Sequence, residues 1–376
     1  MKTRAAVLDR MGMDLPYATS RPLIIRTVDL DEPGPDEVLI KVAAAGLCHS
    51  DLSVINGDRP RPMPMALGHE ASGIVEEVGS HVHDLQRGDH VVVVFVPSCG
   101  HCAPCAEGRP ALCEPGAAAN GAGTLLSGAR RIHQDGDAVL NHHLGCSVFA
   151  DYAVVSRRSL VRIDPEIPLD QAALFGCAVL TGVGAVVNTA QMRAGGSAAI
   201  IGLGGVGLAA LIGAYAAGAR TIVAIDLSPA RLDDALALGA THAIDARNPD
   251  AAAEVRALTD GGVEYAFEFA GAIRALELAY AITRRGGTTV TAGLPPASAS
   301  FAVPAVSLVA EERTVKGSYI GTCVPSRDIP RYMDLYKRGR LPVDRLLSGR
   351  LALEDINHGF DLLREGKAVR QVVVFS

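Results

Sequence analysis

The sequence contains no tryptophan, and its 8 tyrosines and 8 phenylalanines make up only 4% of 376 residues. With about half of the residues apolar and a fifth charged, the composition is that of a soluble globular protein. It also lacks an excess of basic charge, since 35 Lys and Arg stand against 41 Asp and Glu, a net charge of −6. Nucleic acid and anionic membrane surfaces are therefore not expected as partners.

One apolar stretch, residues 197–219, approaches the length of a membrane span and carries no charge. It holds six glycines, four of them near its start, which favours a buried strand, a glycine turn and a buried helix. We therefore expect no membrane segment. The first residues lack the apolar region of a secretory signal, so a cytoplasmic location is expected, where the eight cysteines stay reduced.

The texture of the sequence changes near residue 174. Before it, short alternating runs such as 37–43, 72–79 and 87–94 predict a β-rich fold. From there to about 318, β-branched runs alternate with Ala- and Leu-rich stretches, which predicts βαβ units on a doubly wound parallel sheet. We expect one domain from residues 1–178 and 322–376 and a second from 179–321.

Four cysteines occupy one short segment with the spacing C-x2-C-x2-C-x7-C: Cys99, Cys102, Cys105 and Cys113. Four thiolates around one point suit a closed tetrahedral zinc site, which stabilises structure and leaves no position for chemistry. An iron–sulfur cluster is an alternative, although the usual ferredoxin spacings differ, and disulfides are a further alternative.

A glycine motif marks a dinucleotide site in the second domain. Gly202-Leu-Gly204-Gly205-Val206-Gly207 fits G-x-G-x-x-G between a predicted strand, 198–201, and a predicted helix, 208–217. Asp226, nineteen residues later, ends another predicted strand, where a carboxylate binds ribose hydroxyls and favours NAD over NADP. Arg231 is interpreted as a ribose or pyrophosphate contact. A plain strand-end cap at Asp226 and a flavin in this turn are the alternatives.

Cys48, His69 and Cys177 are candidates for a second metal site. Two thiolates and one imidazole with an open fourth position form a catalytic zinc arrangement. They are far apart in the sequence, so their spacing alone does not bring them together. Taken singly, Cys177 would more often be a small buried core residue, and His69 would more often be a loop histidine with its hydrogen bonds satisfied.

Three motifs in order, the segment 68–79 beginning Gly68-His69-Glu70, the four-cysteine segment and the glycine motif, resemble the zinc-dependent medium-chain alcohol dehydrogenases. The likeness covers nearly the whole chain. Residues 114–136 look like the longer loop of the liver-type and glutathione-dependent formaldehyde (class III-like) branches. The resemblance implies a GroES-like catalytic domain and a Rossmann NAD-binding domain.

The resemblance also implies roles for individual residues. Cys48, His69 and Cys177 would bind the catalytic zinc, Glu70 would lie behind it and Asp51 would orient His69. Ser50 would pass the alcohol proton outward, but Ser53 stands where many members have the histidine that ends this relay. The implied cofactor contacts are His49, Thr181, Gly202, Gly204, Gly205, Val206, Gly207, Asp226, Arg231 and Arg370. The implied substrate pocket holds Phe95, His143, Leu144, Leu294 and Arg59, although Arg59 is more often simple solvent surface at such a position.

The expected function is zinc-dependent hydride transfer between NAD and a primary alcohol or aldehyde, aromatic or long-chain, with two zinc ions per chain. A thiol-dependent formaldehyde dehydrogenase and a polyol dehydrogenase are the enzymatic alternatives, and a non-catalytic zinc and dinucleotide binder is a remote one. Glu114 follows the last cysteine, where the glutathione-dependent branch has a nearby arginine, so glutathione-adduct activity is not expected. Family members with the long loop imply a homodimer through residues 304–317, with a homotetramer as the alternative.

Overall fold

The structure, a computed structural model, describes residues 1–134, 138–296 and 298–376. The chain forms two compact units, one of Met1–Cys177, Val324–Arg331 and Leu347–Ser376 and the other of Ala178–Cys323 and Tyr332–Leu346. The sequence analysis assigned residues 332–346 to the first domain. They group with the second unit, where the short 3-10 helix Val343–Leu346 contacts α7 (Gly205–Ala216).

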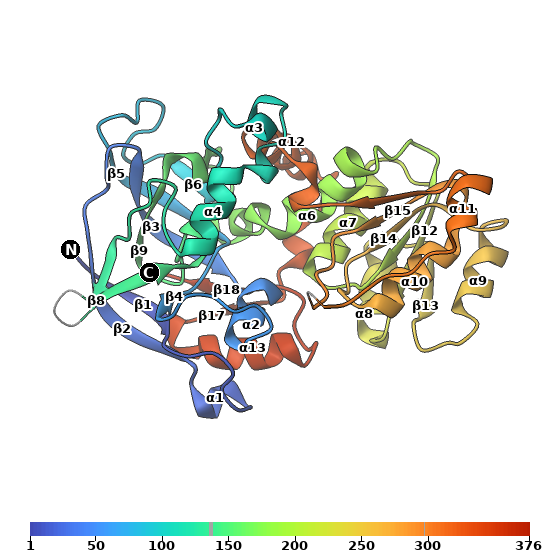
Figure 1. Cartoon of the computed structure of the whole chain (residues 1–376), viewed down its shortest axis with the longest axis horizontal. Helices are drawn as coiled ribbons and strands as arrows, with labels where there is room; N and C mark the ends of the chain where they lie inside the picture. Colours follow the sequence, from blue (N-terminus) through green and yellow to red (C-terminus); the bar gives the residue numbers. More distant parts are fainter. Residues whose placement is uncertain (135–137, 297) are drawn as a thin grey trace. The chain divides into compact units, whose positions relative to one another are not determined.

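The first unit is β-rich and holds both chain termini (Figure 1). A closed barrel has the strand order β1-β2-β7-β8-β4, and a seven-stranded sheet has the order β10-β6-β5-β3-β18-β17, with β9 paired to β3. The strands are β1 Lys2–Leu8, β2 Leu23–Leu30, β3 Glu37–Gly46, β4 Met65–Ala66, β5 Ala71–Val78, β6 His90–Val93, β7 Ile132–Gln134, β8 Ala138–His142, β9 Tyr152–Ser156, β10 Leu160–Arg162, β17 Gly349–Leu351 and β18 Gln371–Val374.

Aliphatic residues form much of the core of this unit. Val7, Val28, Leu30, Leu140 and Val154 pack together in one cluster at the barrel. The helices of the unit are short: α1 Tyr17–Ser20, α2 His49–Ile55, α3 Ala103–Ala106, α4 Glu114–Ala122, α5 Leu169–Ala172 and α13 Ile356–Arg364.

The expected long loop at 114–136 is partly regular. It begins with α4, whose N-terminus carries Pro115 and whose C-terminus is Gly123 in the left-handed conformation (φ 69°). It then continues into β7, while residues 135 and 136 lie outside the described residues.

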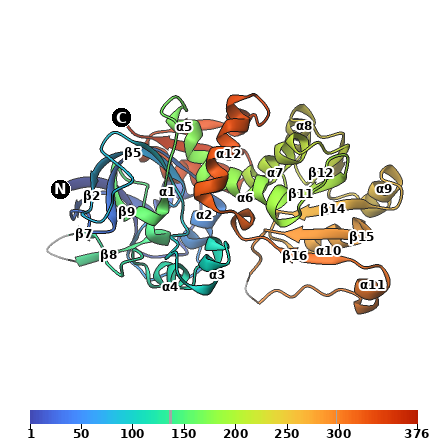
Figure 2. The ribbon, with the colours of Figure 1, turned by 90° about the horizontal axis from the view of Figure 1, so that it is seen from above.

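The second unit confirms the predicted doubly wound parallel sheet. Six parallel strands have the order β13-β12-β11-β14-β15-β16, and helices flank them on either side (Figure 2). Its elements are α6 Ala178–Gly184, β11 Ser197–Ile201, α7, β12 Thr221–Asp226, α8 Pro229–Ala237, β13 His242–Asp245, α9 Ala251–Leu258, β14 Val263–Glu268, α10 Ile273–Ile282, β15 Thr283–Thr291, α11 Ala305–Ala310 and β16 Thr314–Gly317. α12, Pro325–Lys337, has residues in both units.

Strand order reverses between β11 and β14, and ligands of open α/β sheets bind at such switch points beyond the carboxyl ends of the strands. The apolar stretch 197–219 forms β11, a glycine turn and α7, all largely buried. Within the described residues no single helix is long and apolar enough to cross a membrane. One consecutive pair of helical segments, Leu169–Gly176 and Ala178–Thr189, reaches that length and composition together.

Candidate active site

Three segments of the first unit bring Cys48, His69 and Cys177 together. Cys48 follows β3 and precedes α2, His69 lies between β4 and β5, and Cys177 follows the 3-10 turn Ala173–Gly176. Their ligand atoms and a Glu70 oxygen lie within 4.8 Å of one another, and all four residues are buried. Gly68 allows this approach, because its φ is +97° and a Cβ there would lie 2.4 Å from the Phe149 nitrogen.

The donor set fits a zinc ion. His69 Nδ1 lies 3.0 Å from Asp51 Oδ1, so the ring donates there and turns the lone pair of Nε2 away from Asp51. Nε2 is buried and has no partner among the described residues, an arrangement that a metal would satisfy. A hydrogen bond from Cys177 lowers the pKa of Cys48 well below that of an ordinary thiol, and the thiolate is the form that binds metal.

Glu70 and Arg370 form a buried charged pair beside the thiols. Arg370 Nη1 donates to the Leu47 carbonyl at 2.9 Å and lies 3.3 Å from Glu70 Oε2, at ion-pair distance but without an aligned hydrogen bond. Burial raises the pKa of Glu70 to about 7. Arg370 is 3% exposed, so in this conformation its guanidinium faces the protein interior.

Asp51 lies between two histidines. His143 Nδ1 is 3.1 Å from the same Oδ1 that binds His69, and the three residues are buried. Burial opposes the Asp51 carboxylate, but its contacts with His69 and His143 lower its pKa below the ordinary value. The ring of His69 also meets the edge-on ring of Phe95, with centroids 5.2 Å apart.

The four-cysteine segment also converges on one point, with the Sγ atoms of Cys99, Cys102, Cys105 and Cys113 within 4.8 Å of one another. Burial raises the pKa of Cys113, and the backbone amides of Cys99 and Gly116, which donate to its Sγ at 3.1 and 3.3 Å, act in the opposite direction. Backbone hydrogen bonds lower the pKa of Cys99 to about 6, whereas burial raises that of Cys105 to about 12. The cluster cannot ionise fully without a cation, and all eight cysteines of the chain are free thiols.

The glycine turn of the second unit has the geometry that close phosphate approach requires. Gly202 has φ +88°, and a Cβ on Gly207 would lie 1.8 Å from the Gly202 carbonyl oxygen. α7 begins at Gly205, so its free amides follow the turn directly. Asp226 Oδ2 accepts from the Leu203 nitrogen at 2.6 Å and Oδ1 from Ser228 at 2.9 Å, which fixes the carboxylate at the end of β12.

Comparisons with known proteins agree with both units. Residues 34–165 match the alcohol dehydrogenase GroES-like domain, and residues 205–338 match the zinc-binding dehydrogenase family. The chain is 38% identical to the NDMA-dependent alcohol dehydrogenase of Amycolatopsis methanolica and 34% identical to the S-(hydroxymethyl)glutathione dehydrogenase of Paracoccus denitrificans, over 100% of each chain. Benzyl alcohol dehydrogenase of Acinetobacter calcoaceticus has a TM-score of 0.93 at 32% identity, also over 100% of both chains.

This chain belongs to the zinc-dependent medium-chain alcohol dehydrogenases. The resemblance stated from the sequence is confirmed, as are the GroES-like and Rossmann folds that it implies. It is an oxidoreductase of the class III-like group within that family. The individual roles of its site residues remain predictions, to which the geometry adds the following.

Relative to the family pattern, Ser50 and Ser53 of α2 differ in what they bind. Ser50 is half-buried, and its hydroxyl makes no hydrogen bond within the described residues of the first unit. Ser53 donates its hydroxyl to the His49 carbonyl one turn back, at 2.8 Å. The hydroxyl at the position of the family's relay histidine is therefore bonded to its own helix.

The remaining predicted residues divide between the two units. In the first, Phe95 and Leu144 are buried, Arg59 is half-buried and His49 is exposed. In the second, Thr181 on α6 and Val206 on α7 are half-buried, and Leu294 is 56% exposed. Arg231 lies near the glycine turn, since a Cβ built on Gly204 would be 3.5 Å from Arg231 Nη1.

In this alcohol dehydrogenase, sequence reasoning missed Asn120 and Arg61. The side-chain Nδ2 of Asn120, on α4, donates to the Phe95 carbonyl at 2.9 Å. The backbone carbonyl of Asn120 accepts a hydrogen bond from Arg61 Nη1 at 3.2 Å. α4 thus holds the backbone of the residue whose ring contacts His69. No spacing in the sequence signals this contact, because it joins three segments that only tertiary packing brings together.

Proposed function

We propose that this protein oxidises primary alcohols, aromatic or long-chain, to aldehydes with NAD as hydride acceptor. The observation that carries the proposal is the buried set of two thiols and one imidazole whose Nε2 has no partner in the part of the chain that the structure describes. Benzyl alcohol dehydrogenase and the NDMA-dependent alcohol dehydrogenase, two relatives along the whole chain, support an alcohol as substrate.

Cys48, His69 and Cys177 would hold the catalytic zinc, and the four-cysteine segment a second, structural zinc. When bound, the catalytic zinc supplies Lewis acidity at the alcohol oxygen, and the nicotinamide supplies the hydride acceptor. Asp51 holds the His69 ring in the tautomer with a proton on Nδ1, which leaves Nε2 free to bind metal. The buried side chains of Phe95 and Leu144 would keep water away from the metal site.

Ser50 Oγ is the proposed first acceptor of the alcohol proton, because it is half-buried and lies two residues after Cys48. Ser53 does not extend this path, since its hydroxyl is bonded to His49. Beyond α2, bound NAD would supply a ribose hydroxyl as the next acceptor of this proton.

NAD is proposed over NADP on the position of Asp226. Its carboxylate is held by two backbone amides at the end of β12, and each oxygen keeps a lone pair for a ribose hydroxyl. A 2′-phosphate at that place would face a negative charge.

The proposal is tested by NADH formation with a panel of ethanol, long-chain primary alcohols, benzyl alcohol and sorbitol, and formaldehyde with and without each of several thiols. Benzyl or long-chain alcohols should give the highest kcat/KM without any thiol. Turnover restricted to formaldehyde plus a thiol, or to sorbitol, would replace the proposed substrate class. A protein that binds NADH and turns over nothing in the panel would be a non-catalytic binder.

A homodimer is proposed through α11 and β16 of the second unit. β16 is an edge strand paired only with β15, and Val306 and Val309 on α11 are 72% and 81% exposed. Exposed apolar side chains beside an open strand edge are typical of an interface. A cytoplasmic location is proposed because the two metal sites need six of the eight free cysteines as thiols.

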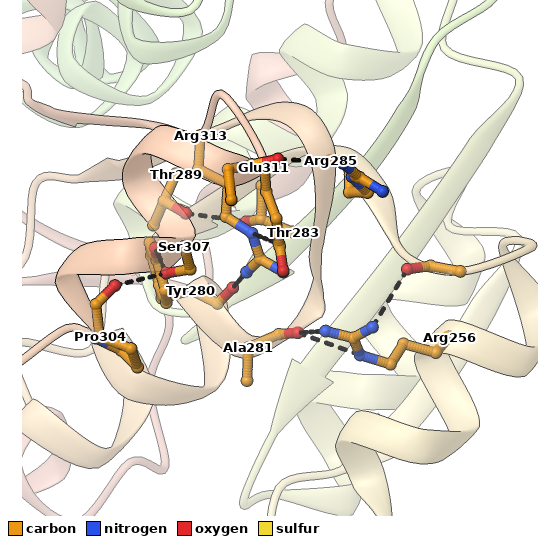
Figure 3. A network of polar contacts seen from close by, with 12 residues as sticks. Arg256, Tyr280, Ala281, Thr283, Arg285, Thr289, Pro304, Ser307, Glu311 and Arg313 are labelled. Carbon is orange, nitrogen blue, oxygen red and sulfur yellow. Dashed lines mark hydrogen bonds and ion pairs between the residues drawn. The ribbon is translucent and has the colours of Figure 1, made fainter.

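A network of polar contacts holds this surface in place (Figure 3). Arg313 Nη1 donates to the Tyr280 carbonyl at 2.7 Å and its guanidinium lies 4.9 Å from the centroid of the Tyr280 ring. The Tyr280 hydroxyl forms a hydrogen bond with the Ser307 hydroxyl, which in turn donates to the Pro304 carbonyl at 2.7 Å.

Val309→Asp should convert the dimer to monomers in sedimentation velocity, and a matched exposed substitution, Val139→Asp in the first unit, should not. A wild-type monomer would contradict the proposal.

A further inference from the structure

His143 is a second histidine at the carboxylate that holds the predicted zinc ligand His69. Its Nδ1 lies 3.1 Å from Asp51 Oδ1, and His69 Nδ1 lies 3.0 Å from the same oxygen. All three side chains are 1% exposed or less. Two imidazoles therefore meet one buried carboxylate.

The backbone fixes His143 in this position. The 3-10 turn His143–Gly145 follows β8 directly, and Leu144 and Gly145 have φ of 51° and 65°. The His143 nitrogen donates to Ser147 Oγ at 3.0 Å, and that hydroxyl donates to the Ala66 carbonyl of β4 at 2.8 Å. The same residues thus tie the turn to the strand that precedes His69.

The Asp51 carboxylate has two oxygens, enough to accept one hydrogen bond from each of the two imidazoles. Oδ1 is aligned with His69, whereas His143 Nδ1 lies within reach but off the hydrogen-bond direction, and Oδ2 is buried without a partner. A small rotation of the carboxylate or of the ring gives each imidazole one oxygen. The His143 ring also packs edge-on against His69, with centroids 5.5 Å apart at 87°.

The ring nitrogen of His143 that faces the Asp51 carboxylate is Nδ1. A neutral histidine carries its one proton on either ring nitrogen, and only the tautomer with the proton on Nδ1 can donate to Asp51.

We propose that His143 is a positioning residue for the zinc ligand His69: it holds the Asp51 carboxylate, which in turn holds the imidazole that binds the metal. The inference rests on the proposed catalytic zinc. Partners of a ligand's hydrogen-bond acceptor fix the orientation of the ligand and slow the loss of the metal.

Two variants of the zinc-loaded protein separate the hydrogen bond from the shape of the ring. His143→Phe keeps a planar ring but removes the donor, whereas His143→Asn carries a donor, Nδ2, at the place of Nδ1. Release of zinc to a chromogenic chelator should be about tenfold faster from one of the two sites in His143→Phe and close to wild type in His143→Asn. In cobalt-substituted protein, only His143→Phe should shift the visible absorption bands.

The four-cysteine site serves as an internal control, because its release rate should be the same in all three proteins. Equal release rates and spectra for His143→Phe and wild type would overturn the inference, as would a His143→Asn variant that loses zinc as fast as His143→Phe. A Cys48→Ser protein that holds as much zinc as wild type would overturn the proposed catalytic site itself. The two failures are therefore distinguishable.

Discussion

Gly207 offers the sharpest test of the dinucleotide turn, because local helix propensity and packing predict opposite effects of one methyl group. Gly207 lies inside α7, where replacing glycine by alanine in an exposed helix stabilises by about 1 kcal/mol. In this helix the new Cβ would lie 1.8 Å from the Gly202 carbonyl oxygen. The Gly202 nitrogen is itself bonded to the Ile225 carbonyl at 2.9 Å, so the turn cannot easily retreat.

Relief of this contact needs α7 to move by more than about 1 Å, and overpacking of this kind costs about 1–3 kcal/mol. After the gain in propensity, Gly207→Ala should destabilise by up to about 2 kcal/mol, and the thermal midpoint should fall by up to about 8 °C. Circular dichroism melts measure the midpoint, and NADH fluorescence titration measures cofactor affinity, which should fall as well.

Gly204→Ala is the matched control. Its Cβ would meet nothing closer than Arg231 Nη1 at 3.5 Å, and its φ and ψ of −69° and −176° suit alanine. This variant should melt like wild type yet bind NADH about tenfold more weakly, because the methyl occupies the approach of the pyrophosphate. A Gly207→Ala protein at least as stable as wild type, with unchanged affinity, would refute the reasoning.

Three further predictions concern charge and metal. Asp226→Ala should raise the Kd for NAD about tenfold and lower that for NADP; unchanged discrimination between the two, measured by titration, would reject the ribose contact. Burial lowers the pKa of His142 to about 4, so between pH 6.5 and 4 the unfolded chain binds a proton at this residue that the folded chain does not. The contribution of His142 to the free energy of unfolding is therefore fully present above pH 6.5 and falls by about 3 kcal/mol towards pH 4. Urea unfolding across this range should show this pH dependence of the free energy of unfolding. His142→Gln, which can still accept from the Arg131 nitrogen, should lose the dependence; the same change with pH in both proteins would reject the assignment to His142. Cys99→Ser should remove one zinc per chain and lower the melting temperature while the zinc at Cys48 remains; a variant that keeps both ions would contradict the four-thiolate site.

The motifs with local causes could be predicted from the sequence. The glycine turn depends on a strand, a turn and a helix that are consecutive in the chain, and the four cysteines converge within one segment. The alternation of β-branched and Ala-rich runs likewise predicted the parallel sheet. These features need only short-range geometry, so periodicity and spacing suffice.

The contacts around the second metal site could not be derived in this way. Cys48, His69 and Cys177 converge because the end of β3, the connection between β4 and β5, and the 3-10 turn Ala173–Gly176 lie beside one another, and only the family resemblance indicated it. His143 was expected as a pocket residue, and its contact with Asp51 depends on a left-handed turn at Leu144 that the sequence does not signal. The pairing of Arg370 with Glu70 likewise joins β18 to the segment after β4.

Zinc content and turnover, measured together on the wild-type protein and on Cys48→Ser, test the central claim most directly. The account predicts two zinc ions per wild-type chain and one in the variant, with alcohol-dependent NADH formation abolished and the circular dichroism spectrum unchanged. A folded Cys48→Ser protein that retains two zinc ions, or that still reduces NAD at the wild-type rate, would contradict it.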